Sequence, residues 1–311
     1  MPTHLLGSHL SIAGSMTNAL AEAESLKLDT VQVFTKNQQQ WKVKPLDPAA
    51  TADWLAELAR LGWQDRTVAH ASYLINLASP DDELWQKSID LMTVELERCE
   101  ALSIPYLVHH PGAYTTSTEP KGLARIARAY KQLFKRTKGF RVVSCLENTV
   151  GSGSNLGAPF DQLATLRADI IDKAGDETRV GFCFDTCHAH AAGHDMASRS
   201  AAQATLDAFD HHCGLDNLKC LHINDSKKPL ASRKDRHEHI GQGFIGGRTA
   251  NPDDKTPTFK PNLAQSGFAA VMADPRLVGK PMIMETPKGT TEAGTPFDRL
   301  NARRLRKLIP A

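Results

Sequence analysis

Short apolar runs alternate with longer amphipathic stretches along almost the whole chain, about eight times in all. The apolar runs predict β-strands over residues 4–10, 30–35, 67–71, 105–110, 141–148, 180–186, 218–225 and 281–286. The amphipathic stretches between them predict helices over residues 16–26, 49–61, 82–102, 123–134, 160–172 and 201–212. Strands that are almost continuously apolar are typical of a parallel sheet covered by helices. The pattern therefore predicts an α/β fold, a TIM (β/α)8 barrel.

The length and composition fit one barrel domain. A TIM barrel takes roughly 250 residues plus insertions, and this chain has 311 residues, of which 41% are apolar. No linker or composition break divides it, so we expect a single domain over residues 1–311. No stretch approaches the roughly 20 apolar residues of a membrane span, and the N-terminus lacks the basic and apolar segments of a secretory signal. We therefore expect a cytoplasmic protein with no membrane partner.

The cysteines do not follow a zinc-knuckle spacing, and most lie in apolar surroundings. They are Cys99, Cys145, Cys183, Cys187, Cys213 and Cys220. We interpret them as reduced thiols of the core. Cys183 and Cys187 could form a ligand pair, but four residues apart across a strand end they would be poorly placed for one ion.

The overall charge does not indicate a dedicated nucleic-acid binder. The formal net charge is only +2 and the isoelectric point is near 8.2, whereas such proteins are usually more basic. Any nucleic-acid site must then be a local patch. The candidates are Lys36, Lys42 and Lys44, and then Lys227, Lys228, Arg233, Lys234 and Arg236. The basic residues near the C-terminus, Arg303, Arg304, Arg306 and Lys307, are interpreted as a solvated helix face.

Residues that can bind metals collect at the downstream ends of the expected strands. They are His70, His110, Glu147, Asp185, His188, His222, Asp235, His237 and Glu285. In a barrel these strand ends gather at one rim, where the loops build the active site. One buried histidine alone is usually a hydrogen-bonded core residue, but that reading does not explain nine nitrogen and oxygen donors at equivalent positions. Nine ligands without a thiolate exceed what one zinc or manganese ion could use.

Strand geometry decides between the adjacent His109 and His110. Their side chains point to opposite sides of the strand, and we assign His110 to the rim because Pro111 and Gly112 directly after it mark the turn. His9 ends the first strand and could touch a substrate or support a ligand. We interpret His190, His194, His211 and His212 as ordinary polar residues of loops or helix surfaces, and Glu238 and His239 could support the ligands beside them.

A series of long sequence motifs, in the same order and over nearly the whole chain, resembles the endonuclease IV family of apurinic/apyrimidinic endonucleases. The motifs are GSHLSIAGS, FTKNQQQW, HASYLINLASP, HHPGAY, LENTVGSGSNLG, FDTCHAHAAGHD, HINDSK, SRKDRHEHIGQGFIG and METP. The resemblance implies a TIM barrel with three zinc ions that hydrolyses duplex DNA on the 5′ side of abasic sites and leaves a 3′-hydroxyl. It also implies removal of blocking groups from 3′ ends. We expect no obligatory protein partner.

The resemblance also implies how the ligands are shared. His70 and His110 would hold one zinc ion, while Asp185, His222 and Glu285 would hold a second. Glu147 would bridge these two ions and act as the catalytic carboxylate. The third ion would be held by His188, Asp235 and His237, and one of the positions could also take manganese.

The chemistry of the reaction supports the same expectation. A phosphodiester repels hydroxide, so its hydrolysis needs cations that neutralise it, a metal-bound hydroxide and a Lewis acid on the leaving oxygen. Zinc lowers the pKa of bound water to about 7, so no separate histidine base is required. We expect hydroxide on the ion pair bridged by Glu147 to attack phosphorus while the third ion stabilises the departing 3′ oxygen.

By the same match, three residues are implied to enter or contact the DNA duplex. They are Gln39 in NQQQW, and Tyr73 and Leu74 in ASYLINL, which offer a stacking surface and an apolar wedge. The damaged nucleotide leaves the helix more easily because it has no base that pairs or stacks with its neighbours. Gln39 departs from the family, whose well-known members carry arginine there. A second departure is the proline-rich stretch 247–262, which we interpret as a surface-loop insertion.

Two other functions are compatible with part of the pattern. A sugar isomerase or epimerase of the xylose-isomerase-like barrels would use Glu147, Asp185, His222 and Glu285 as its Glu, Asp, His, Glu metal set. Such a one-metal site has no use for the other five candidate ligands. A metal-stabilised nucleic-acid-binding module is disfavoured as well, because structural zinc sites prefer cysteine and close their coordination.

Overall fold

Eight parallel strands close into a barrel in the computed structural model, which describes residues 4–247 and 262–310. Around the barrel the order is β1, β10, β7, β6, β5, β4, β3 and β2, and β2 pairs with β1. The strands span Leu5–His9 (β1), Thr30–Val33 (β2), Val68–His70 (β3), Tyr106–His109 (β4), Val143–Glu147 (β5), Val180–Asp185 (β6), Leu218–His222 (β7) and Pro281–Met284 (β10). The TIM barrel expected from the sequence is confirmed.

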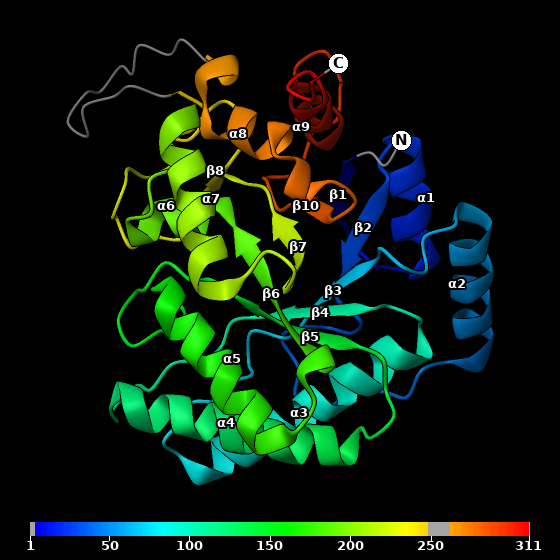
Figure 1. The fold of residues 1–311 in the computed structure, drawn as a ribbon. Helices are drawn as coiled ribbons and strands as arrows, with labels where there is room; N and C mark the ends of the chain where they lie inside the picture. Colours follow the sequence, from blue (N-terminus) through cyan, green and yellow to red (C-terminus); the bar gives the residue numbers. More distant parts are fainter. Residues whose placement is uncertain (1–3, 248–261, 311) are drawn as a thin grey trace.

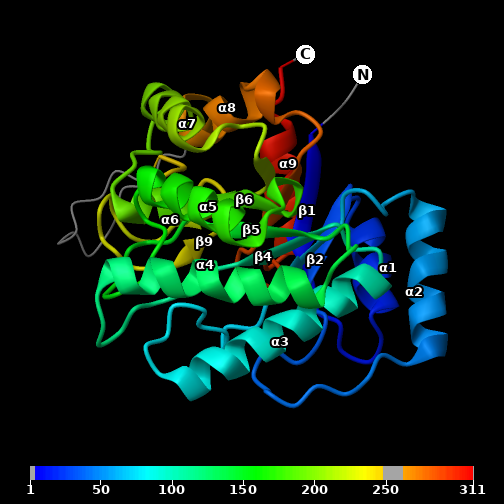
Figure 2. The ribbon, with the colours of Figure 1, turned by 60° about the horizontal axis from the view of Figure 1, so that its bottom comes forward.

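Helices surround the barrel, as the two views in Figure 1 and Figure 2 show. The helices on the first half are Thr17–Ser25 (α1), Pro48–Leu61 (α2), Asp82–Ala101 (α3), Glu119–Arg136 (α4) and Phe160–Ala174 (α5). Those on the second half are Thr186–Ala192 (α6), Arg199–Cys213 (α7), Gly267–Ala273 (α8) and Phe297–Arg306 (α9). Short 3-10 turns lie at Glu177–Arg179, Leu263–Gln265 and Pro275–Leu277.

Local sequence signals set the helix boundaries closely where caps are present. Asp47 accepts a hydrogen bond from the backbone N–H of Ala50, and Pro48 occupies the first turn of α2. Gly62 then ends α2 in the left-handed region, at φ +66°. Asp81 caps α3 in the same way as Asp47 caps α2. This chemistry explains why the expected helices 49–61 and 82–102 match the structure within one residue.

Two layers of packing form the core. Inside the barrel, β3 to β7 and β10 contribute Val68, Val108, Cys145, Cys183, Cys220 and Ile283, all fully buried. Outside the barrel, a larger apolar cluster fills the space between the strands and the helices. All six cysteines are free and buried, so the expectation of reduced core thiols is confirmed.

Three helices and one small hairpin depart from the expected pattern. The helix α6 begins at Thr186, directly after β6. Helix α8 precedes β10 in the sequence, and helix α9 follows it. The hairpin pairs Asp225–Ser226 (β8) with His237–Glu238 (β9). Each of these elements is short or polar, so hydrophobic periodicity carried little signal for them.

No helix within residues 4–247 and 262–310 is long and apolar enough to cross a membrane. The insertion expected at 247–262 lies almost wholly outside the described residues, since residues 248–261 are not described.

Candidate metal centre

The predicted ligands meet at one rim because they follow the ends of parallel strands. Four of them are the last residues of their strands, namely His70, Glu147, Asp185 and His222. His110 and Glu285 directly follow β4 and β10, and His188 lies in the first turn of α6, three residues after the end of β6. Asp235 lies in the loop before β9, and His237 is the first residue of β9. The closed barrel therefore converts positions far apart in the sequence into one cluster.

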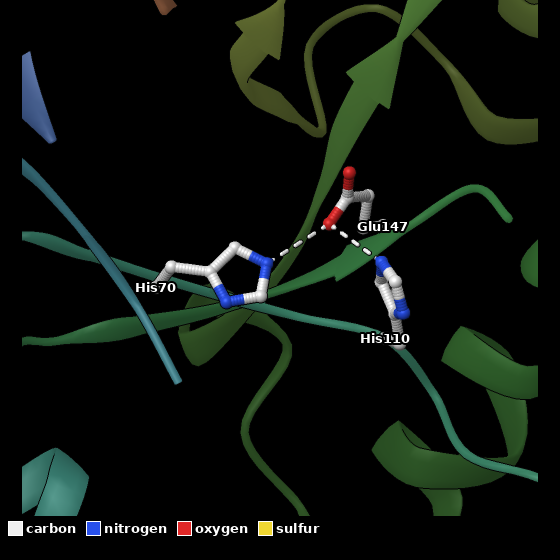
Figure 3. A group of neighbouring side chains, drawn as sticks. All are labelled: His70, His110 and Glu147. Carbon is white, nitrogen blue, oxygen red and sulfur yellow. Dashed lines mark hydrogen bonds and ion pairs between the residues drawn. The ribbon is translucent and has the colours of Figure 1, made fainter. Parts of the chain in front are cut away.

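The first group of ligands joins His70, His110 and Glu147 (Figure 3). The Nε2 atoms of His70 and His110 lie 3.3 and 3.4 Å from Oε2 of Glu147. All three donor atoms lie within 4.8 Å of one another. Two imidazoles and a carboxylate that converge in this way match the nitrogen and oxygen ligands of zinc.

The second group joins Glu147, Asp185, His222 and Glu285. Nδ1 of His222 lies 2.9 Å from Oε1 of Glu147, 3.2 Å from Oε2 of Glu285 and 3.8 Å from Oδ2 of Asp185. Glu147 thus offers Oε2 to the first group and Oε1 to the second. This is the placement that a bridging carboxylate requires.

The third group joins His188, Asp235 and His237 on the side of the rim formed by α6 and the β8–β9 hairpin. Nε2 of His188 and Nε2 of His237 each lie 3.2 Å from an oxygen of Asp235. Oδ2 of Asp185 lies 3.7 Å from Nε2 of His237, so Asp185 stands between the second and third groups. The structure brings the first two inferred sets together as groups of ligands. Around the third, it groups His188 and His237 with Asp185, and Asp235 and His237 with Cys187, while Asp235 contacts each histidine through a different oxygen.

Hydrogen bonds fix which ring nitrogen each histidine presents to the cluster. Nδ1 of His70, His188 and His237 lies 2.8, 3.0 and 3.2 Å from a backbone carbonyl oxygen, which can only accept a hydrogen bond. Nε2 of His222 lies 2.8 Å from Oε1 of Gln32. In His70, His222 and His237 the other nitrogen faces the carboxylates, which is how protein histidines are oriented toward metals. In His188 both nitrogens do so, since Nδ1 also lies 3.2 Å from Oε1 of Glu147 while Nε2 lies 3.2 Å from Oδ2 of Asp235.

The charges of the cluster depend on one another. Burial opposes ionisation of Glu147 and Glu285, but the surrounding imidazoles outweigh it and hold the pKa of both carboxyls well below the ordinary range. Burial likewise opposes protonation of His188 and His222, but the neighbouring carboxylates raise the pKa of both rings well above 6.5. In the absence of divalent cations, protons on the histidines therefore balance the buried carboxylates.

The residues present fit a set of divalent zinc ions. Nε2 of His188 and Nε2 of His237 are buried and make no hydrogen bond, although both point toward Asp235. Buried polar atoms are normally satisfied, and a bound metal ion would supply the partner that these two nitrogens lack. The donors are imidazole nitrogens and carboxylate oxygens, which suit zinc and also manganese.

Several residues that support the ligands were missed by the sequence analysis. Asn148 exchanges two hydrogen bonds with the backbone of Asp185, at 2.7 and 3.0 Å. Asn224 donates to Oδ2 of Asp185 at 2.7 Å and accepts from the backbone N–H of Glu285 at the same distance. Both asparagines are buried and lie within the sequence motifs named above. Each is adjacent to a carboxylate in the sequence, and this was the signal that could have identified them.

The histidines outside the three groups agree with the expectations in part. His109 points away from the rim, as predicted, and its Nε2 lies 2.7 Å from the hydroxyl of Tyr130. His9 lies 3.2 Å from Oε1 of Glu285, which favours the supporting role over contact with a substrate. The expectation that His190 is a surface residue is wrong, because α6 buries it to 2% exposure. His239 stacks on Phe297 with ring centroids 4.0 Å apart.

The cysteine pair considered from the sequence is divided between two groups of ligands. Cys183 lies with Glu147 and His222, whereas Cys187 lies with Asp235 and His237. Burial raises the pKa of the Cys187 thiol to about 12, so both the geometry and the protonation state disfavour a shared ion.

The residues expected to contact DNA lie on two adjoining loops of the same rim. Gln39 is exposed in the loop after β2, and Tyr73 and Leu74 lie in the turn after β3. The side chain of Tyr73 is 63% exposed, and its ring centroid lies 5.3 Å from that of His70. The Ser72 hydroxyl donates to the Gln38 carbonyl at 2.5 Å and ties the loops together.

One member of the first basic patch is not available to a ligand. Lys36 is buried, and its ammonium donates to the carbonyls of Asn37 and Gln40 at 3.0 and 3.1 Å. Its Nζ also lies 3.7 Å from Oε1 of the buried Glu95. The expectation that Lys36 forms part of a nucleic-acid patch is therefore wrong, because its charge serves to hold the loop.

The second basic group borders the third set of ligands. A pocket of about 500 Å³ is lined by the candidate ligands His110, His188 and Asp235 together with cationic side chains. These cationic residues are Lys228, Arg233, Lys234 and Arg236. A polar pocket that joins metal ligands to lysine and arginine can hold a phosphate group.

A tight glycine loop, residues 241–246, wraps around the buried Asp225 carboxylate. The Asp225 carboxylate accepts backbone N–H groups of Gly241, Gly243 and Gly246 at 2.9 to 3.2 Å. A Cβ at position 246 would meet Oδ2 of Asp225 and the backbone of Gly241 far inside van der Waals contact. Only glycine allows this close approach.

We expect Gly246→Ala to lower the free energy of unfolding by about 1–3 kcal/mol, because overpacking displaces the Asp225 loop. Urea unfolding measures this loss. The comparison variant is Gly279→Ala, where the new Cβ meets open space and only the φ of +81° is unfavourable. A smaller loss at position 246 than at position 279 would contradict the packing argument.

The sequence and the fold of this chain are similar to those of known proteins. The family described as a xylose isomerase-like TIM barrel matches residues 20–249. A protein named probable endonuclease 4 from Chloroflexus aurantiacus is 43% identical over 303 residues and is matched over 97% of both chains. The crystal structure of endonuclease IV from Thermus thermophilus superimposes with a TM-score of 0.79 at 34% identity, covering 97% of this chain and 98% of that one.

Sugar epimerases share the fold alone. A D-tagatose 3-epimerase-like protein superimposes with a TM-score of 0.67 at 15% identity, covering 99% of this chain and 97% of the other. An identity this low carries no argument about activity.

Proposed function

Because the chain belongs to the endonuclease IV family, within the xylose isomerase-like TIM barrels, we propose that it is a zinc-dependent DNA-repair endonuclease. The family resemblance found in the sequence is thereby confirmed, and so is the expectation of an enzyme of this family. The proposed reaction is hydrolysis of the phosphodiester 5′ to abasic sites in duplex DNA, which leaves a 3′-hydroxyl. Removal of blocking groups from 3′ ends and a cytoplasmic location are part of the same proposal.

One observation carries the proposal. Glu147 joins two groups of ligands through its two carboxylate oxygens, and the third group stands beside them across Asp185. A one-metal sugar site would use only the second group and would leave His70, His110, His188, Asp235 and His237 without a role. Hydrolysis of a phosphodiester can use all three groups.

We assign His70, His110 and Glu147 to the first zinc ion and Glu147, Asp185, His222 and Glu285 to the second. His188, Asp235 and His237 would hold the third. When bound, the three ions would neutralise the phosphodiester, lower the pKa of a water nucleophile and act as Lewis acids on the leaving oxygen. Manganese could replace zinc at one position.

The protein's own side chains would bind and orient the DNA around this centre. Lys228, Arg233, Lys234 and Arg236 border the pocket of the third group, where they can bind backbone phosphates. Tyr73 lies beside the first group with its side chain exposed, and Leu74 and Gln39 lie on the adjoining loops. In the proposed function, Tyr73 would serve as a stacking surface and Leu74 as a wedge for a nucleotide that leaves the helix.

We expect Tyr73→Ala to weaken binding of an abasic duplex by about 1–3 kcal/mol, which is roughly 5- to 150-fold in Kd, because a stacking surface is lost. Tyr73→Phe keeps the ring and should bind as the unaltered protein does. Fluorescence anisotropy with a labelled duplex, at fixed salt concentration, measures both. Equal loss in the two variants would show that the hydroxyl, and not stacking, is the contact.

The decisive experiment is incision of a duplex oligonucleotide that carries one abasic-site analogue, with the zinc content measured on the same preparation. We expect incision 5′ to the lesion, about three zinc ions per chain and loss of activity with a chelator. Intact DNA beside a fully metallated protein would overturn the proposal, and aldose–ketose isomerisation by that preparation would favour the sugar isomerase.

A further inference from the structure

We propose that Gln32 is a positioning residue, whose side-chain amide fixes the proton of His222 and the orientation of Glu285 so that both face the second metal position. This inference rests on the proposed function. Gln32 lies on β2, is fully buried and belongs to none of the three groups of ligands. The amide lies 253 residues from Glu285 and 190 residues from His222 in the sequence.

The amide makes a different contact with each of the two ligands. Nε2 of Gln32 donates to Oε1 of Glu285 at 2.7 Å, and Oε1 of Gln32 lies 2.8 Å from Nε2 of His222. Nε2 of Gln32 also lies 2.9 Å from Nδ1 of His9, which itself stands 3.2 Å from the same oxygen of Glu285. Gln32 therefore sits directly behind the two ligands.

The chemistry of the groups determines the orientation of the amide. An ionised carboxylate only accepts hydrogen bonds, so Glu285 must face the NH₂ end of Gln32. The carbonyl end then faces His222, and an amide carbonyl also only accepts. His222 must therefore carry a proton on Nε2. With that proton fixed, the lone pair available for a metal is on Nδ1, the atom that lies near Glu147 and Glu285.

The same contact restrains Glu285. Its Oε1 is held by Gln32, while its Oε2 lies 3.2 Å from Nδ1 of His222 on the side of the cluster. The one amide thus leaves Oε2 of Glu285 and Nδ1 of His222 facing the second metal position, where both can act as ligand atoms. Groups that hold metal ligands in this way typically change metal affinity by about 10–100-fold when they are lost.

The test is Gln32→Met, which keeps the length of the side chain and removes both hydrogen bonds. We expect the affinity for one of three zinc ions to fall by about 10–100-fold, as measured by competition with a chromophoric chelator. Gln64→Met is the matched control, because Gln64 is exposed and precedes β3 at the opposite end of the barrel. The control should bind zinc as the unaltered chain does, and both variants should unfold cooperatively.

Two spectroscopic measurements separate positioning from general destabilisation. In zinc-loaded protein, ¹H–¹⁵N correlation of the imidazole rings should show His222 protonated at Nε2, and Gln32→Met should lose protection of that proton from exchange. The cobalt(II) spectrum should change for Gln32→Met and stay unchanged for Gln64→Met. Unaltered zinc affinity and an unaltered cobalt spectrum in Gln32→Met would overturn the inference.

Failure of the inference and failure of the proposed function have different signatures. If the unaltered protein binds about three zinc ions and incises abasic DNA while Gln32→Met matches it in zinc affinity, only the role of Gln32 is refuted. If the unaltered protein binds no zinc with its nine candidate ligands intact, the proposed function itself is refuted.

Discussion

Glu147→Gln is expected to reduce incision of abasic DNA by at least about 10³-fold and to lower the zinc content of the protein. The amide keeps the size of the side chain but replaces one ligand oxygen by an NH₂ group that binds no cation. Since Oε2 faces His70 and His110 and Oε1 faces His222, either orientation of the amide removes a ligand from one group. Metal ions stabilise the charge of such a transition state by several kcal/mol, and losing that stabilisation accounts for the expected fall in the rate of incision.

Single-turnover incision and zinc analysis on the same preparation measure the effect of Glu147→Gln. The control is Glu100→Gln, because the Glu100 carboxylate accepts the backbone N–H groups of Arg141 and Val142 before β5, at the opposite end of the barrel. The control should retain full activity. A Glu147→Gln protein with full zinc content and an unchanged rate would refute the bridging role.

Removal of the metal ions is expected to abolish incision and to lower the melting temperature, and the drop should be larger at higher pH. A ligand present at 100 times its Kd stabilises the folded state by about 2.7 kcal/mol per site. Zinc binds neutral imidazole, so its stabilisation increases as the pH rises. The difference in melting temperature between zinc-loaded and metal-free protein should therefore widen between pH 5.5 and pH 8.

The metal-free protein follows the opposite trend over the same range. Although burial opposes their charge, neighbouring carboxylates raise the pKa of His188 and His222, so their contribution is fully present below pH 6.5 and is lost as the pH rises through the raised values. The imidazoles hold the pKa of Glu147 and Glu285 below 4.5 against the effect of burial, so their contribution is lost only as the pH falls through the lowered values.

Thermal unfolding monitored by circular dichroism, with and without a chelator, follows both trends. Zinc added back after chelation should restore incision and the melting temperature together. A difference in melting temperature that stays constant with pH would contradict the assignment of histidines as ligands, and incision that survives complete removal of metal would contradict the proposed reaction.

Much of this protein is determined by local sequence. Alternation of apolar runs with amphipathic stretches predicts the barrel, because strands covered by helices must be apolar on both faces. Turn and cap residues such as Asp47, Pro48 and Gly62 fix helix ends to within a residue. Seven of the nine candidate ligands lie at the end of a barrel strand or within three residues of it, and parallel strands necessarily direct those ends to one rim. Asp235 and His237 lie instead at the β8–β9 hairpin.

Other features depend on contacts between residues that are distant in the sequence. Which oxygen of Glu147 faces which histidine follows from closure of the barrel, because strand order and register set the distances. Burial of Lys36 reverses the role expected from its charge, since an ammonium that loses water must find carbonyls and a carboxylate nearby. The amide of Gln32 has no motif of its own. Only the tertiary structure brings it against Glu285 and His222, because hydrogen bonds depend on distance and direction in space, and these are not encoded by sequence spacing.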